Sequence, residues 1–176
     1  MSAFTNDFME ESGMSFGPFT ANNRFAIEKS KLHRSLGDGY KIVEFIALKD
    51  DKELVFVEAK PTGYISNLAV PYLDSKIREL TEKFENSIDL FLSAFIGWRM
   101  DEHNEIGSML KTSNYSHIKG KCYLVINGAD DGICMGISMA LQETLRRRLN
   151  IHKLDVIAIN DVAAKEYRLI RSSVYK

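Results

Sequence analysis

The sequence predicts a single mixed α/β domain spanning residues 1–176, with a central mixed β-sheet flanked by helices. Short runs rich in Ile, Val and Phe alternate with longer segments whose apolar residues recur every three or four positions. The first pattern is typical of buried strands and the second of amphipathic helices. Three early strands followed by alternating helices and strands predict an αβββαβ core, with one helix and one strand appended.

The composition is that of an ordinary globular domain, with 45% apolar and 27% charged residues. The formal net charge is -1, so any nucleic-acid surface has to be a local basic patch. Cys122 and Cys134 lie in apolar surroundings, which favours buried, reduced thiols and a cytoplasmic protein. The N-terminal segment lacks a signal-peptide pattern, and no apolar run reaches ~18 residues, so we expect no membrane span.

The first 36 residues predict short elements. Residues 1–23 are expected to form an N-terminal helix, with Phe4, Phe8 and Met9 on one face, followed by a turn-rich segment. Residues 24–36 fit either a helix or a polar edge strand. The glycine-rich turn that leads from them into the next strand favours the strand.

Two strands, over residues 40–48 and 54–59, are predicted at the centre of the sheet. The polar residues 50–52 between them supply the turn that reverses the chain. Pro61 ends the second strand because proline cannot donate a hydrogen bond to a neighbouring strand.

The longest predicted element is a helix over residues 74–98, capped by Asp74 or Ser75. Its apolar residues are spaced three or four apart and predict a face buried on the sheet. Residues 99–120 are polar and are expected to form a loop. The apolar positions of this helix are Ile77, Leu80, Phe84, Ile88, Phe91 and Phe95.

The C-terminal third predicts one more helix between two short buried strands. The strands cover residues 121–127 and 154–160, and the helix runs to about residue 149 with Asp130 or Asp131 as its cap. Because helices cross over between the later strands, these strands are expected to run parallel to one another.

Charged residues interrupt the apolar pattern of the central hairpin. Glu58 and Lys60 share one face of their strand because side chains alternate. With a three-residue loop, Lys49 faces Glu53, and counting back brings Glu44 opposite Glu58, with Cβ atoms ~5 Å apart. Two carboxylates at that distance repel unless one is protonated or a cation lies between them. Mg²⁺ with oxygen ligands would remove this repulsion.

These residues resemble the PD-(D/E)XK nuclease superfamily. An acid on one strand, a polar turn and Glu58-Ala59-Lys60 at the end of the next strand match its pattern, and a long helix follows, as in that fold. The resemblance spans about residues 3–128. It implies Glu44, Glu58 and the Ala59 carbonyl as ligands of Mg²⁺, or alternatively Mn²⁺, with Lys60 positioning the water that hydrolyses a DNA phosphodiester.

Many members of this superfamily carry a further acid near the N-terminus. The resemblance points here to Glu10 or Glu11, or to Glu28 if its segment is helical. Asp51 also has a spacing that occurs in the superfamily for the first acid. It lies at the turn, however, ~20 Å from Glu58 along the strand, so Glu44 is better placed.

Two basic clusters are candidates for contacts with nucleic acid. Arg146, Arg147 and Arg148 could contact phosphates, although they also suit the negative C-terminal end of a helix, which is the interpretation we favour. Lys119 and Lys121 border the polar loop and are the second cluster. The histidines show no metal-ligand spacing.

The leading functional hypothesis is a Mg²⁺-dependent endonuclease or exonuclease that cleaves DNA. It would act as a homodimer or as a subunit of a larger defence or repair assembly. The alternative is a catalytically inactive nuclease-fold module that binds nucleic acid or protein. The near-neutral charge, and a Glu where the superfamily usually has Asp at the first acidic position, favour this alternative.

Overall fold

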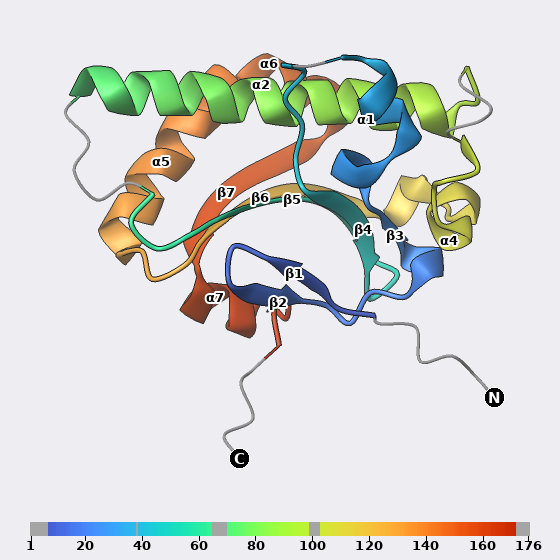
Figure 1. Cartoon of the computed structure of the whole chain (residues 1–176), viewed down its shortest axis with the longest axis horizontal. Helices are drawn as coiled ribbons and strands as arrows, with labels where there is room; N and C mark the ends of the chain where they lie inside the picture. The colour runs from blue at the N-terminus through green and yellow to red at the C-terminus, as the bar shows by residue number, and fades with distance from the viewer. Residues whose placement is uncertain (1–6, 38, 65–69, 99–102, 172–176) are drawn as a thin grey trace.

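The computed structural model describes residues 7–37, 39–64, 70–98 and 103–171. As predicted, the fold is mixed α/β, with helices flanking a mixed five-stranded sheet (Figure 1). A separate two-stranded antiparallel hairpin accompanies that sheet. The strands of the main sheet lie in the order β3 (Arg24–Phe25), β4 (Phe45–Lys49), β5 (Glu53–Lys60), β6 (Lys119–Ile126) and β7 (Leu154–Asn160).

The register of the central hairpin is the predicted one from Lys49 back to Phe45. The predicted pairing of Glu44 with Glu58 is not formed, because the Glu44 amide donates to the Val57 carbonyl. β4 and β5 are antiparallel, with Lys49 paired to Glu53 and Phe45 paired to Val57. Asp50 and Asp51 form the turn with φ values of 50° and 55°, a left-handed conformation that Asp tolerates better than most residues. β5, β6 and β7 run parallel, which confirms the expected crossovers.

Three helices cover one face of the sheet: α2 (Val70–Phe95), α5 (Asp131–Thr144) and α6 (Arg146–His152) (Figure 1). The predicted apolar stripe of α2 packs on this face, and five of its six members are buried. α2 begins at Val70, so the predicted cap at Asp74 or Ser75 is wrong. Asp130 does cap α5, where its side chain accepts a hydrogen bond from the Gly132 amide (2.8 Å).

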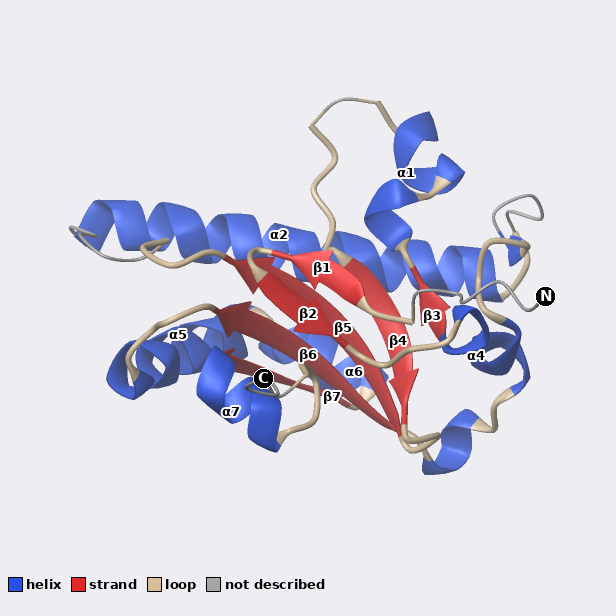
Figure 2. Cartoon of the chain, turned by 60° about the horizontal axis from the view of Figure 1, so that its bottom comes forward, coloured by secondary structure: helices blue, strands red, loops and turns tan. Residues whose placement is uncertain are grey.

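The opposite face is covered by β1 (Met9–Glu11), β2 (Met14–Phe16) and α7 (Asp161–Glu166) (Figure 2). The predicted helix over the N-terminal segment is therefore wrong where it falls on described residues, and Phe4 lies outside them. Ser12 and Gly13 take left-handed φ values of 52° and 77°, which close a tight turn. Met9, Met14 and Phe16 then pack on the sheet at a period of two, as strands require.

The segment between this hairpin and β4 contains short helical turns separated by irregular stretches. The strand expected over residues 24–36 is limited to the two residues of β3, and η2 (Ile27–Lys29) and α1 (Lys31–Ser35) follow it. Ser30 caps α1 by accepting a hydrogen bond from the His33 amide. Residues 40–44, expected to begin the next strand, precede β4.

The expected loop over residues 99–120 is largely ordered into short elements where it is described. α4 (Ser108–Thr112) and η3 (Tyr115–His117) lie between α2 and β6, and residues 99–102 fall outside the described ranges. The helix expected up to residue 149 divides at Leu145 into α5 and α6. In the part of the chain that the structure describes, no helix is long and apolar enough to cross a membrane.

The outer edge of the sheet at β7 is covered by side chains of α5. The Ser138 hydroxyl accepts a hydrogen bond from the Ala158 amide (2.8 Å). The Gln142 side-chain amide donates to the Val156 carbonyl (3.2 Å). Backbone groups that an edge strand usually leaves open therefore have partners within the chain.

Candidate functional site

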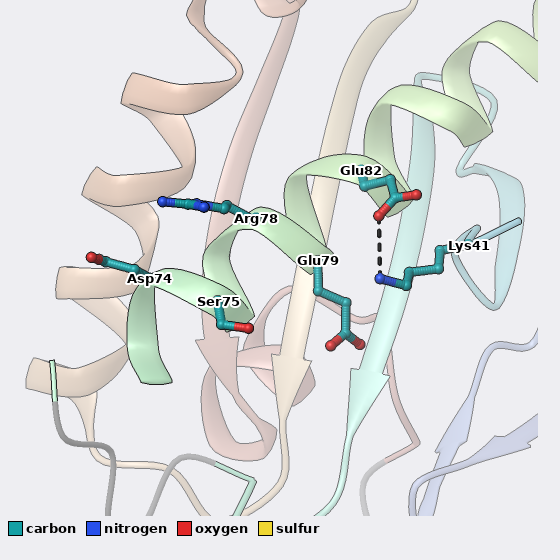
Figure 3. Close-up of a pocket in the computed structure, with 6 residues that line it drawn as sticks. All are labelled: Lys41, Asp74, Ser75, Arg78, Glu79 and Glu82. Carbon is teal, nitrogen blue, oxygen red and sulfur yellow. Dashed lines mark hydrogen bonds and ion pairs between the residues drawn. The ribbon is translucent and has the colours of Figure 1, made fainter. Parts of the chain in front are cut away.

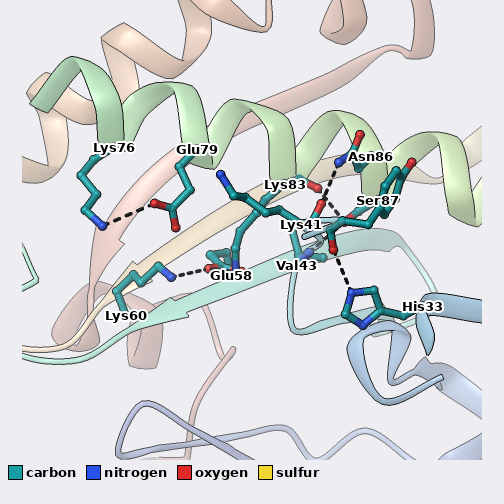
Figure 4. Close-up of polar contacts among 11 residues, drawn as sticks. His33, Lys41, Val43, Glu58, Lys60, Lys76, Glu79, Lys83, Asn86 and Ser87 are labelled. Carbon is teal, nitrogen blue, oxygen red and sulfur yellow. Dashed lines mark hydrogen bonds and ion pairs between the residues drawn. The ribbon is translucent and has the colours of Figure 1, made fainter. Parts of the chain in front are cut away.

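Glu58 is the centre of the candidate site. It lies on β5, on the face that α2 covers, and its side chain has 0% exposure. Its Oε1 atom lies 2.7 Å from the Lys60 ammonium and 2.7 Å from the Lys83 ammonium (Figure 4). Its Oε2 atom is buried and has no hydrogen-bond partner among the described residues. One oxygen is thus held by two cations, and the other is open to a further ligand.

Lys83 is a site residue that the sequence analysis missed. It lies on α2, three residues after Leu80 and next to Phe84, so it occupies the stripe that packs on the sheet. Burial lowers the pKa of Lys83, but the charge and hydrogen bond of Glu58 outweigh burial and the net shift is upward. Lys83 is therefore an ammonium at neutral pH. A lysine within an otherwise apolar helical stripe was the available signal.

Glu44 reaches the site through an irregularity at the start of β4. Phe45 pairs with Val57, and the Glu44 amide also donates to the Val57 carbonyl (3.1 Å). Two successive residues therefore oppose one, which is the arrangement of a β-bulge, a feature that re-aims side chains. The segment before Glu44 is anchored to α2, because the Val43 amide donates to the Ser87 hydroxyl (2.8 Å).

The carboxyl group of Glu44 lies among other carboxyl groups. Burial, a hydrogen bond with the Glu28 carboxyl and the nearby charges of Glu58, Glu28 and Glu11 raise the pKa of Glu44 to about 8. A hydrogen bond between two carboxyl groups requires a proton on one of them. With this raised pKa, Glu44 carries a proton at neutral pH, and this proton relieves the repulsion from Glu58.

The three N-terminal acid candidates differ in whether they lie near Glu44. Glu28 lies in η2 and bonds Glu44, as expected if its segment were helical. Glu11 acts on Glu44 by its charge and forms an ion pair with Lys29 (2.7 Å). Glu10 is exposed and accepts a hydrogen bond from the Ser15 hydroxyl (2.6 Å). The structure therefore brings Glu28 and Glu11 to the site and leaves Glu10 outside it.

The Ala59 carbonyl points toward the same region. Carbonyls of alternate residues in a strand point to the same side. The Val57 carbonyl accepts from Glu44, and the Lys60 carbonyl accepts from the Asn127 amide on the opposite side. The carbonyl of Ala59 is consequently directed toward the start of β4, where Glu44 lies.

An open cleft of about 410 Å³ borders the cluster, although Glu44, Glu58 and Lys60 are not among its lining residues. Glu28, which bonds Glu44, and Lys83, which bonds Glu58, both line it. Its other charged or ionisable lining residues are His33, Arg34 and Lys41, so cationic groups outnumber the single carboxylate. A second cavity of about 420 Å³ shares Lys41 and carries mixed charges (Figure 3).

His33 fixes one wall of this cleft. Its Nδ1 lies 2.8 Å from the Glu28 carbonyl and its Nε2 lies 2.8 Å from the Tyr40 carbonyl. Because a carbonyl can only accept, each contact is a hydrogen bond when the ring nitrogen that faces the carbonyl is the donor. His33 thereby holds η2, and with it the Glu28 side chain, against the segment that leads to β4.

The predicted basic clusters do not converge on Glu58. Lys119 pairs with Glu53 at the opposite end of β5 from Lys60. Lys121 lies over the Tyr123 ring, on the face of the sheet away from α2. Arg148 forms a two-pronged ion pair with Asp89 (2.7 and 2.8 Å) that ties α6 to α2. The other two members of that cluster, Arg146 and Arg147, are exposed at the start of α6.

The donor set suits a hard divalent cation. Mg²⁺ is typically held by one or two carboxylates and keeps several waters. Glu58 offers an unpartnered oxygen, and Glu44 and the Ala59 carbonyl would complete such a set. No group of three or more His, Cys, Asp or Glu side chains in the described ranges is arranged as a metal site. Mg²⁺ would therefore depend on two side chains, a carbonyl and water.

The chain was compared with family models, curated proteins and solved structures. No match was found in any of these comparisons.

Proposed function

We propose that the protein is a Mg²⁺-dependent nuclease that hydrolyses DNA phosphodiester bonds. The observation that carries the proposal is the buried Glu58 carboxylate, with two lysines on one oxygen and no partner on the other. Perturbed acids and bases that gather at a cleft are typical of catalytic sites. The resemblance of Glu44, Glu58 and Lys60 to the PD-(D/E)XK pattern agrees with this chemistry.

Each residue of the site has a separate role in hydrolysis. A bound Mg²⁺, held by Glu58, Glu44 and the Ala59 carbonyl, would stabilise the negative charge that develops on the phosphate. Lys60 orients the attacking water, since its ammonium already lies beside the carboxylate that would hold the ion. Lys83 holds the Glu58 carboxylate in place through its ion pair. The cations of the cleft bind the phosphates of the strand.

Cleavage assays on Glu58→Gln and Lys60→Met test this proposal. We expect each variant to lose at least ~100-fold of Mg²⁺-stimulated cleavage of a labelled DNA, the scale of a lost acid–base group. Glu10→Gln is the matched control, because Glu10 is a nearby acid outside the cluster. Circular dichroism establishes that the variants are folded. Cleavage that persists unchanged in Glu58→Gln would refute the assignment.

A second candidate function is a binding module without catalysis. The hydrogen bond between Glu28 and Glu44, and the two ion pairs of Glu58, balance most of the charge without a metal. Calorimetric titration with Mg²⁺ or Mn²⁺ separates the two functions. A nuclease takes up the ion in a manner that depends on Glu44 and Glu58, whereas a binding module takes up none.

The setting of the activity is also part of the proposal. Cys122 and Cys134 are buried free thiols, as predicted, which agrees with a reducing cytoplasm. Action as a homodimer or as a subunit of a defence or repair assembly remains our expectation, and sedimentation analysis of the purified protein tests the first of these.

A further inference from the structure

A row of cationic and aromatic side chains extends from Glu58 toward the start of α2. The Lys60 ammonium, which bonds Glu58, also lies 4.9 Å from the centre of the Tyr64 ring. Lys76 lies on α2. Its ammonium lies 5.1 Å from the centre of the Tyr64 ring and 5.9 Å from the centre of the Tyr72 ring. Each contact is within the range of a cation–π interaction. The site is therefore continuous with a tyrosine–lysine platform made of Tyr64, Tyr72 and Lys76.

The two tyrosines differ in accessibility. Tyr64 is half-buried, and its hydroxyl is buried without a hydrogen-bond partner among the described residues. Its ring holds Lys60 and Lys76 near one another, which makes it a positioning residue. Tyr72 is 60% exposed, a high value for a large aromatic side chain at the border of a charged site. Its ring is available to a partner with a flat, apolar surface.

From this geometry we infer that the site acts on unpaired nucleic-acid strands, with a base stacked on Tyr72 and the adjoining phosphate at Lys76. Bases within a duplex are stacked on their neighbours, whereas an unpaired strand presents base faces to aromatic side chains. The inference rests on the proposed function and adds the class of strand.

The cations of α2 are arranged to follow such a strand. Lys76 and Lys83 are seven residues apart, which is two helical turns and ~10 Å along the same side of the helix. Figure 4 shows Lys76 and Lys83 on α2, with Lys60 beside Glu58 on the strand that the helix covers. Glu79 lies 3.4 Å from Lys76, and this partly exposed pair exchanges readily for a phosphate because such pairs contribute little.

Binding measured without divalent ions tests the inference apart from cleavage. Fluorescence anisotropy of a labelled single-stranded oligothymidine and of a blunt hairpin duplex is recorded with wild type and Tyr72→Ala at low salt. We expect the variant to weaken single-strand binding by roughly 5- to 100-fold, the range for one lost base–aromatic stack. Duplex binding should change by less than about twofold, because no unpaired base reaches Tyr72.

Two further variants provide controls. Tyr72→Phe retains the ring and should bind the single strand as wild type does. Tyr167→Ala removes another exposed tyrosine, 42% exposed and just after α7 on the other face, and should leave binding unchanged. Equal losses for single strand and duplex, no loss in Tyr72→Ala, or no single-strand binding by wild type would each overturn the inference.

The outcomes also distinguish this inference from the proposed function. Tyr72-dependent binding of single strands with no cleavage under Mg²⁺ or Mn²⁺ would support the inference and reject the nuclease. If wild type cleaves DNA with Mg²⁺, and Tyr72→Ala cleaves single strands and duplexes as fast as wild type does, the nuclease is supported and the inference is rejected. Tyr72 serving a protein partner instead would appear as the absence of any effect on oligonucleotide binding.

Discussion

Replacement of Lys83 by methionine isolates the buried ion pair at the centre of the site. Methionine retains an unbranched apolar chain, so the substitution removes mainly the charge. Lys83 and Glu58 side chains are 12% and 0% exposed, and their charged atoms are 2.7 Å apart. At an effective dielectric constant of 20, this distance gives a gross attraction of ~6 kcal/mol. Desolvation of both groups offsets most of that attraction.

The net loss in the free energy of unfolding depends on the interactions that Glu58 keeps in the variant. A hydrogen bond between charged groups contributes ~1.5–3 kcal/mol, and an unpaired buried charge costs ~3–5 kcal/mol. Lys60 still holds the same oxygen of Glu58 in the variant, so the lower range applies. We expect Lys83→Met to lower the free energy of unfolding by ~2 kcal/mol. With a urea dependence of ~2 kcal/mol/M, the midpoint falls by ~1 M.

Urea titration at pH 7 without divalent ions measures this loss. Lys41→Met is the matched control, because Lys41 and Glu82 form a similar pair at 3.2 Å with both side chains nearly half exposed. Exposed pairs contribute less than ~1 kcal/mol. In a Glu58→Gln background, Lys83→Met should cost at least ~1.5 kcal/mol less than in wild type. A loss in Lys83→Met no larger than in Lys41→Met would refute the reasoning.

Other predictions concern the neighbouring acid and two glycines. Burial and the Glu28 hydrogen bond raise the pKa of Glu44 from its ordinary value near 4.5 to about 8. The contribution of the protonated Glu44 carboxyl to the free energy of unfolding is full below pH 4.5 and is lost as the pH rises to about 8. The free energy of unfolding of Glu44→Gln, measured by urea titration, should therefore rise relative to wild type by on the order of 1–2 kcal/mol between pH 5 and pH 9. Parallel pH profiles of the two proteins would contradict this. Gly107→Ala should cost at least ~2 kcal/mol in urea unfolding, since its Cβ would clash with the Asn22 carbonyl oxygen. Gly136→Ala in α5 meets nothing within 4 Å and should gain ~0.5–1 kcal/mol, so a loss there would refute the packing argument.

The elements whose pattern is set locally were predictable. β7 has the predicted boundaries, and α2 buries its predicted stripe, because long apolar periodicity leaves few alternatives. The pairing of Lys49 with Glu53 followed from the length of the turn. In contrast, the β1–β2 hairpin has only three residues per strand, and its stability comes from packing on the main sheet, which no local pattern reveals.

The candidate site was predictable only along the hairpin. Glu58 and Lys60 are two residues apart in one strand, and alternation alone brings them to one face. Lys83 and Glu28 reach the site from a helix and from η2, and their positions depend on how these elements pack. The bulge at Glu44 likewise depends on the anchoring of Val43 to Ser87. Apart from the place of Lys83 within the apolar stripe of α2, such contacts between distant segments have no signature in spacing.

The hydrogen bonds from Ser138 and Gln142 to β7 have a consequence for how copies of the chain meet. A second molecule cannot extend the sheet at that edge without first breaking these bonds. At the other edge, β3 offers only two residues. Growth of a continuous intermolecular sheet, the usual route to fibrous aggregates, is therefore disfavoured at both ends. A homodimer would then form through surfaces other than the edges of the main sheet, which leaves that sheet intact in each copy.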